Sequence, residues 1–283
     1  MSLAVRRLVF YLLLTLFLII APLLLAYTAG YRWSQKQNRI VKTGAMLITS
    51  HPEGAAILVN GEITGRRTPF LLMKLLPGSY EITLEKENYH RWEKNLLVES
   101  ERTTFAHTIP LFLRSIPQLL DHSDSKYVAL KPVNVMLKSY KHYRTFYEPK
   151  TDTIVVVDNQ YHLRLAELPG THAIWQEKES PLLLTYSEYE IWQWIPHESK
   201  RILITRLLGT IKTVIPLSGR EGIIVVMSDR IRALELDLRD RQNSWDLAIF
   251  DVIKKASLSE DNKLLLIEGI REGTEGLWKL ELY

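Results

Sequence analysis

The strongest constraint on this chain is an uncharged apolar run near its N-terminus. No side chain from Leu8 to Tyr31 carries a charge. This run of about 24 residues would span roughly 36 Å as a helix, which is enough to cross a bilayer. We therefore predict a short tail at 1–7 and a transmembrane helix at 8–31, retained as a signal anchor. A cleaved signal peptide, whose small-residue exit Ala26-Tyr27-Thr28 matches poorly, and a buried core helix are the alternatives.

Positive charge is concentrated beside this run. The formal net charge is +4, and no acidic residue precedes Glu53. Six basic residues lie before Glu53, so the rest of the chain is slightly acidic, which argues against a nucleic-acid-binding surface. We expect residues 32–43 to be a basic juxtamembrane linker that meets anionic lipid. The six basic residues are Arg6, Arg7, Arg32, Lys36, Arg39 and Lys42.

The distribution of these basic residues bears on the orientation of the chain in the membrane. Two of these basic residues precede the apolar run and four follow it. Counted literally, that bias places the C-terminus in the cytoplasm. Large domains translocate despite such a bias, and the start at Arg6-Arg7 is typical of a signal anchor. We predict that the bulk of the chain is extracytoplasmic, with a cytoplasm-facing scaffold as the alternative.

Residues 44–113 show the pattern of a small β-sandwich. Tyr80, Ile82 and Leu84 alternate with polar residues, which places apolar side chains on one face of a strand. Asn60-Gly61 is a strong hairpin signal, because both residue types tolerate positive φ. Pro77-Gly78 marks a second turn.

The turn residues of this region resemble the PEGA domain. The resemblance implies an extracytoplasmic module at a membrane surface, with no catalytic residues to transfer. We interpret the motif residues as structural. Asn88 stands where the family has a turn glycine, and we expect it to adopt positive φ. The matching positions are Pro52, Glu53, Gly54, Ala55, Asn60, Gly61, Gly65, Thr68, Pro69, Leu75, Leu76, Pro77, Gly78, Tyr89 and Trp92.

Residues 114–283 contain a repeat. Leu182, Ile223 and Leu264 open similar apolar segments at intervals of 41 residues. A period of this length with several strands per unit is typical of propeller blades. The pattern resembles the WD40 and TolB propellers and leaves room for about four blades, closed or incomplete. A two-sheet sandwich is the alternative. The fold class predicted for the whole chain is therefore mainly β, with one N-terminal helix.

Large aromatics are concentrated in this half of the chain. Trp192 and Trp194 alternate on one predicted strand and therefore share one face. Blade core is the first interpretation of such a pair, and a binding face is the second. We retain Trp192 and Trp194 as candidate binding aromatics.

The sequence carries no recognisable catalytic or cofactor site. The chain has no cysteine, which excludes disulfides and thiolate metal sites, and its eight histidines are scattered. Asp237, Asp240 and Asp246 lack the glycine and terminal glutamate of a calcium loop, so we expect a solvated loop there. We expect no catalytic residue, cofactor or metal.

These observations predict a non-enzymatic binding or scaffold protein of the cell envelope. Its expected partners are the lipid bilayer and envelope polysaccharide or protein, without nucleic acid, and a homo-oligomer is compatible with exposed blade edges. The alternative is a carbohydrate-active or hydrolytic enzyme with its site on the propeller face.

Overall fold

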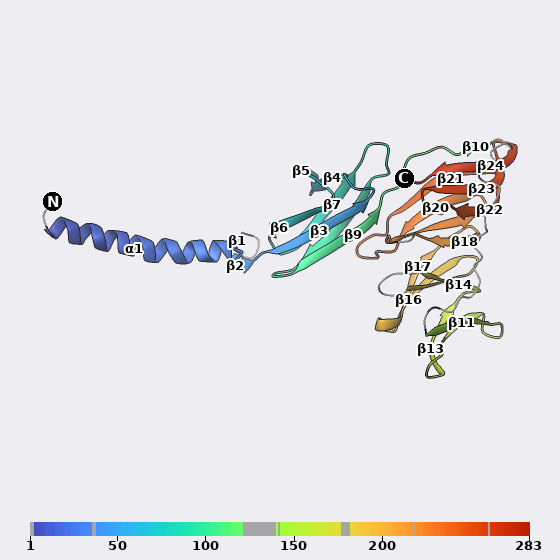
Figure 1. Cartoon of the computed structure of the whole chain (residues 1–283), viewed down its shortest axis with the longest axis horizontal. Helices are drawn as coiled ribbons and strands as arrows, with labels where there is room; N and C mark the ends of the chain where they lie inside the picture. Colours follow the sequence, from blue (N-terminus) through green and yellow to red (C-terminus); the bar gives the residue numbers. More distant parts are fainter. Residues whose placement is uncertain are drawn as a thin grey trace.

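The computed structural model describes residues 3–35, 38–120, 140, 142–176, 182–217, 219–259 and 261–283. One long helix is followed by a β-sandwich and then by a row of further sheets (Figure 1). The sandwich lies between the helix and the sheets that follow it.

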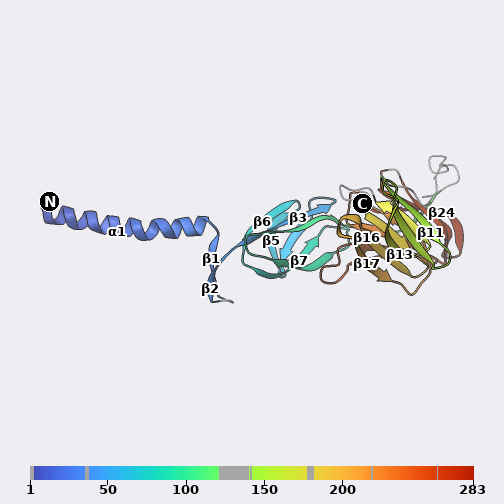
Figure 2. The same cartoon turned by 90° about the horizontal axis from the view of Figure 1, so that it is seen from below.

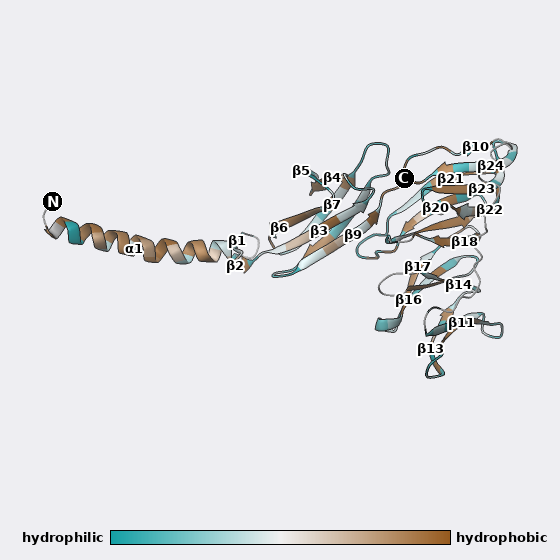
Figure 3. Cartoon of the chain, viewed as in Figure 1, coloured by the Kyte–Doolittle hydropathy of each residue, from teal (hydrophilic) through white to brown (hydrophobic). Residues whose placement is uncertain are grey.

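Helix α1 runs over Leu3–Thr28 and contains Pro22. Its segment Val5–Thr28 is long and apolar enough to cross a membrane, and none of it is buried against the rest of the chain. Apolar residues cover nearly the whole helix (Figure 3). This exposure removes the core-helix interpretation. The helix ends three residues before Tyr31, the end that we predicted.

The expected linker contains a β-hairpin. Strands β1 (Tyr31–Ser34) and β2 (Arg39–Lys42) pair antiparallel. Arg32 explains part of this order, because its guanidinium donates to the carbonyls of Tyr27 and Tyr31 at 2.8 Å. The first residues after the helix are thereby held in a defined position.

The sandwich consists of two sheets with strand orders β6-β3-β9 and β5-β4-β7-β8. Alternation buries Ile82 and Leu84 completely, together with Met46 and Ile48 from the opposite sheet. The first strand β3 pairs parallel with the last strand β9, which closes the unit. The strands are β3 (Gly44–His51), β4 (Ala56–Val59), β5 (Glu62–Arg67), β6 (Phe70–Leu75), β7 (Gly78–Glu85), β8 (Trp92–Val98) and β9 (Thr103–Pro110).

Four further sheets follow one another in chain order, as blades do. Their strand orders are β11-β12-β13, β14-β15-β16-β17, β18-β19-β20-β21 and β22-β23-β24-β10. The last sheet takes its outermost strand from the segment that leaves the sandwich. The strands of the first half are β10 (Gln118–Leu119), β11 (Tyr143–Glu148), β12 (Thr153–Asp158), β13 (Leu163–Pro169), β14 (His172–Gln176), β15 (Leu182–Tyr186), β16 (Glu190–Ile195) and β17 (Lys200–Arg206). Those of the second half are β18 (Ile211–Pro216), β19 (Gly222–Met227), β20 (Arg230–Glu235), β21 (Ser244–Ile249), β22 (Val252–Leu258), β23 (Leu264–Arg271) and β24 (Thr274–Glu281).

The 41-residue repeat is confirmed. Leu182, Ile223 and Leu264 lie at the start of β15, β19 and β23, and each of these is the second strand of its sheet. One detail differs from the sequence unit. The sequence unit that begins at Leu182 extends to the residue before Ile223 and therefore includes residues 211–216. In the structure these residues form β18, the first strand of the next sheet. The sequence unit and the blade are therefore out of phase by one strand.

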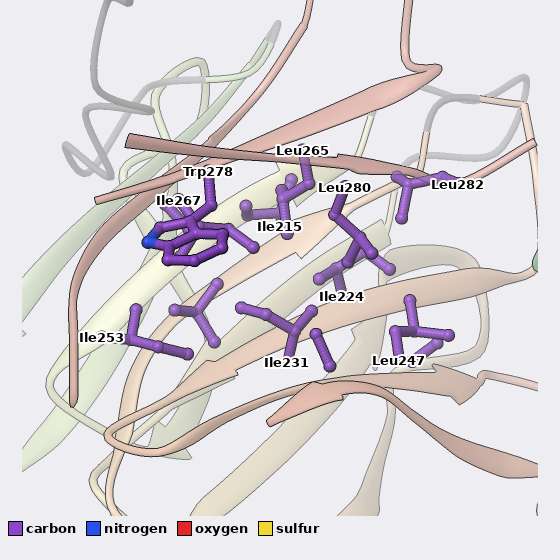
Figure 4. Close-up of a cluster of buried hydrophobic side chains, with 14 of the residues drawn as sticks. Ile215, Ile224, Ile231, Leu247, Ile253, Leu265, Ile267, Trp278, Leu280 and Leu282 are labelled. Atoms are coloured by element: carbon purple, nitrogen blue, oxygen red, sulfur yellow. The ribbon is translucent and has the colours of Figure 1, made fainter. Parts of the chain in front are cut away.

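The sheets form an open arc. In Figure 1 the β22–β24 sheet lies at one end of the row and the β11–β13 sheet at the other. Each pair of neighbouring sheets buries its own core cluster, and in the last of these Ile224 and Ile231 of one sheet meet Leu265 and Leu280 of the next (Figure 4). The propeller-like fold is thus confirmed as an incomplete set of four blades, because the described strands of the two end sheets lie apart in Figure 1.

Candidate functional site

A buried polar cluster joins the sandwich to the blades. Trp92 and Lys94 lie on β8, and both reach Glu235 at the end of β20. Trp92 Nε1 donates to Glu235 Oε1 at 2.8 Å, and Lys94 Nζ lies 2.9 Å from Glu235 Oε2. Asn243 Nδ2 donates to the same oxygen at 2.8 Å. The Lys94 side chain is 0% exposed and that of Glu235 is 2% exposed. We call these four residues the junction cluster.

The loop between β20 and β21 surrounds the junction cluster with further contacts to the sandwich. Asp240 Oδ2 accepts from the Asn95 backbone N–H at 2.9 Å. Arg239 Nη2 donates to the Phe105 carbonyl at 2.8 Å. Lys94 Nζ also donates to the Asp237 carbonyl at 2.6 Å. Asp237 and Asp240 therefore bind protein groups of the sandwich, where we expected a solvated loop.

Burial and charge act in opposite directions on the two carboxyl groups of this junction. Burial raises the pKa of Glu235, and Lys94, Asn243 and Trp92 offset only part of that shift. Burial also acts to raise the pKa of Asp237, but hydrogen bonds from Arg239 and the charge of Lys94 lower it overall. Asp237 is thus the carboxyl whose ionised form favours the folded state.

We expect Asp237→Asn to remove an acid-dependent part of the stability. A carboxyl with a depressed folded pKa stabilises the fold above its unfolded pKa of about 3.9, and this contribution is lost as the pH falls through the folded value. At pH 7 the variant should therefore unfold at a lower urea concentration than the wild type. The difference between the two urea midpoints should become smaller below about pH 4. Urea midpoints at several pH values measure this. A gap that is constant with pH would contradict the assignment.

A second link is formed by the segment that leaves the sandwich. Phe112 is fully buried and packs in the core of the last two blades, beside Trp245 and Tyr283 with ring centroids 5.4 and 5.7 Å away. Burial raises the pKa of Tyr283 to about 12. The Leu113 N–H then donates to the Leu282 carbonyl at 2.9 Å. The chain thus enters the blades as an extra strand along β24.

The PEGA-type motif residues occupy turns of the sandwich. Gly54, Asn60 and Gly61 have φ of +84°, +51° and +79°, and Asn88 has +66° as expected. Ala55 is buried, and the Glu53 carbonyl accepts from Lys86 Nζ at 2.8 Å. Of the other motif positions, Pro52 and Pro69 follow cis peptide bonds, Pro77 lies between β6 and β7, Gly78 opens β7, and Tyr89 bridges to Leu113.

Thr68 has a specific structural role in this motif. Its Oγ1 accepts from the Ala55 N–H at 3.1 Å and lies 2.6 Å from Ser50 Oγ, and all three positions are buried. The hydroxyl therefore pairs two polar groups that water does not reach. The motif threonine closes the turn that carries Pro52 and Gly54.

We expect Thr68→Val to destabilise the sandwich although it preserves the shape of the side chain. Valine leaves the Ala55 N–H and the Ser50 hydroxyl without this partner, at a cost of about 1–3 kcal/mol. Thr104→Val is the matched control, because Thr104 Oγ1 makes only an exposed bond to the Leu97 carbonyl. In thermal unfolding, the melting temperature should fall clearly for Thr68→Val and change little for Thr104→Val. Equal effects would contradict the role of Thr68.

The candidate aromatics Trp192 and Trp194 lie together in a blade core. Trp194 is 2% exposed and makes edge contacts with Tyr143 and Trp175. Trp192 is partly buried, and its Nε1 donates to Glu190 at 2.8 Å. The Trp194 indole is therefore packed in the blade core, while Trp192 stays partly exposed.

Trp194 nevertheless lines a cavity of about 330 Å³ between the first two blades. Two arginines and a glutamate surround the cavity, and each is tied to a neighbour. Arg164 pairs with Glu167 at 2.7 Å, and Arg201 donates to the Glu167 carbonyl at 2.8 Å. Positive charge therefore predominates at the opening, which suits a carboxylate or phosphate group. We call this the blade cavity.

The described residues hold no group of three or more histidine, aspartate or glutamate side chains placed to bind a metal ion. Asp246, the third of the aspartates considered from sequence, pairs with Arg232 at 2.6 Å on the blade surface.

The junction cluster was not predicted from the sequence. Its signal is Lys94, a charged residue in an otherwise apolar alternation with Trp92, Leu96 and Val98. A lysine at a core position requires a buried partner. The partner lies far along the chain, at Glu235, and no local pattern indicates it.

Comparison with known proteins identifies the sandwich. Residues 43–111 match the PEGA domain family. No curated protein matches the chain at a significant level. Among solved structures, the dihydro-heme d1 dehydrogenase NirN matches with a TM-score of 0.38 and 12% identity, over 72% of this chain and 45% of that one. The chain thus spans under half the length of NirN.

Two further solved structures are similar to the same low degree. A chain of the mitotic checkpoint complex has a TM-score of 0.40 and 10% identity, over 89% of this chain and 81% of that one. A quinonprotein alcohol dehydrogenase-like protein from Bacteroides thetaiotaomicron has a TM-score of 0.31 and 12% identity, over 89% and 71%.

Proposed function

We propose that this chain, whose residues 43–111 match the PEGA family, is a non-enzymatic scaffold of the cell envelope, anchored in the membrane by helix α1. The sandwich and the blades form one rigid arm, and the blades present a binding surface away from the bilayer. The bulk of the chain lies outside the cytoplasm in this proposal.

The junction cluster is the observation that carries this proposal. A flexible tether between sandwich and blades needs only a polar linker. Here the two units share a buried ion pair, a buried indole hydrogen bond and the core residue Phe112. Such an arrangement holds the blades at a fixed height and angle above α1. Rigid positioning is what a presenting scaffold requires.

The blade cavity is the part of this surface that we assign to the partner. Its size is at the lower end of the range for ligand sites, and its opening is lined by Arg164 and Arg201. We propose that it takes an acidic segment of an envelope polysaccharide, whose carboxylate or phosphate groups would pair with these arginines.

Binding by the full chain in nanodiscs tests this function. The wild-type protein should retain the acidic polysaccharide fraction of the envelope. The chain length of that polysaccharide should be unchanged after long incubation with the protein. The double variant Arg164→Glu/Arg201→Glu should lose this retention. Arg102→Glu, an exposed arginine of the sandwich paired with Glu99, is the matched control and should bind as the wild type does. Retention of only a protein fraction, unaltered binding by the double variant, or cleavage of the polymer would contradict the proposal.

A further inference from the structure

The hairpin after helix α1 exposes an apolar face. Trp33 and Ile40 are direct cross-strand partners, and their exposed fractions are 57% and 63%. Tyr31 lies on the same face and is 40% exposed. The other face is turned inward, since Ser34 and Val41 are buried. Exposure of a paired indole and isoleucine costs free energy in water, so a two-stranded element of this kind calls for a partner.

The hairpin is fixed to the end of the helix. The Thr43 N–H donates to the Gly30 carbonyl at 3.0 Å, which closes the base of the hairpin. The Arg32 guanidinium lies 3.6 Å from the centroid of the Tyr27 ring on α1. Lys74 of the sandwich approaches the same ring at 5.5 Å. Helix, hairpin and sandwich therefore meet at Tyr27.

The direction of the hairpin matches a membrane surface. Figure 2 shows β1 and β2 running across the axis of α1. When α1 crosses a bilayer, an element perpendicular to it lies in the plane of the headgroups. The described residues of the hairpin include Arg32, Arg39 and Lys42 and no acidic side chain, although Lys42 is paired with Glu101 of the sandwich. Tryptophan and basic side chains are the residues that favour this zone.

We propose that the β1–β2 hairpin is a second membrane contact, seated in the headgroup region of an anionic bilayer through Trp33 and Ile40. Arg39 is paired with Ser34 on the other face of the hairpin and adds positive charge at the same level of the bilayer. With two points of contact, the hairpin sets the angle at which the arm leaves the membrane. This inference rests on the proposed function, because it requires α1 to cross the bilayer.

Quenching by brominated lipid tests the inference on the full chain. Helix α1 contains no tryptophan, so shallow quenching reports residues outside it. The chain is inserted into vesicles of phosphatidylcholine and phosphatidylglycerol, with bromine on acyl carbons near the headgroup. The wild type should be quenched, and Trp33→Phe should lose most of that quenching. Trp192→Phe, a partly buried blade residue, is the control and should keep it. Vesicles without phosphatidylglycerol should quench less.

The outcomes separate the two proposals. If the protein resists carbonate extraction but Trp33→Phe is quenched as strongly as the wild type, the hairpin inference is overturned and the anchor stands. The hairpin inference is also overturned if the anchored wild type is not quenched. If carbonate extracts the wild type, both the anchor and the hairpin contact are overturned. Quenching that is independent of anionic lipid would overturn the role of Arg39.

Discussion

Lys94→Met is expected to destabilise the chain by about 3–5 kcal/mol, because it leaves the buried Glu235 carboxylate without its charged partner. Trp92 and Asn243 still donate to Glu235, but neither supplies a positive charge. Methionine fits the same space, so the loss reports the charge rather than the packing. Urea unfolding of the full chain in detergent, followed by tryptophan fluorescence, measures the change.

Two further variants make this result specific. Lys94→Met/Glu235→Leu removes both charges and should recover a large part of the lost stability. Arg102→Met breaks an exposed ion pair of the same sandwich and should leave the midpoint nearly unchanged. A single variant as stable as the wild type, or a double variant worse than the single one, would show that the Lys94–Glu235 pair does not hold the junction.

Phe112→Ala is expected to have a comparably large effect, about 3–5 kcal/mol, because it opens a cavity in the core of the last two blades. Phe112 belongs to the segment that leaves the sandwich, so its removal should also loosen β10 from β24 and expose their amides to exchange. Hydrogen exchange along β24 measures this second effect directly.

Phe105→Ala is the matched control for this variant. Phe105 lies on β9 of the sandwich and is 51% exposed, so its loss creates no comparable cavity. It should change the unfolding midpoint little and leave exchange along β24 unaltered. If the two phenylalanine variants behave alike, the connecting segment is not part of the blade core.

The sequence predicts the parts of this molecule that depend on local signals. The interval between Leu182, Ile223 and Leu264 leads to equivalent strands, because each repeat must place the same apolar strand at the same depth in a blade. Asn60-Gly61 adopts the positive φ angles that its residue types permit. Asn88 does the same in place of glycine.

The junction could not be predicted in this way. Lys94 lies on β8 and Glu235 lies far along the chain, at the end of β20. The two side chains come into contact only in the folded tertiary structure, so no local sequence pattern indicates their pairing. The pairing of the incoming segment with β24 has the same origin, as Leu113 meets Leu282 near the end of the sequence. The hairpin at residues 31–42 was missed for a different reason. Its two strands have four residues each and include charged residues, a pattern that an irregular linker can also show.

If the sandwich and the blades form one rigid arm, the distance between a site on each of them should be fixed. The chain contains no cysteine, so Ile63→Cys on β5 and Thr274→Cys on β24 give two unambiguous, exposed sites for spin labels. Pulsed electron paramagnetic resonance on the full chain in nanodiscs should give one narrow distance distribution, which Lys94→Met broadens. A broad distribution in the otherwise unaltered chain would contradict the rigid arm.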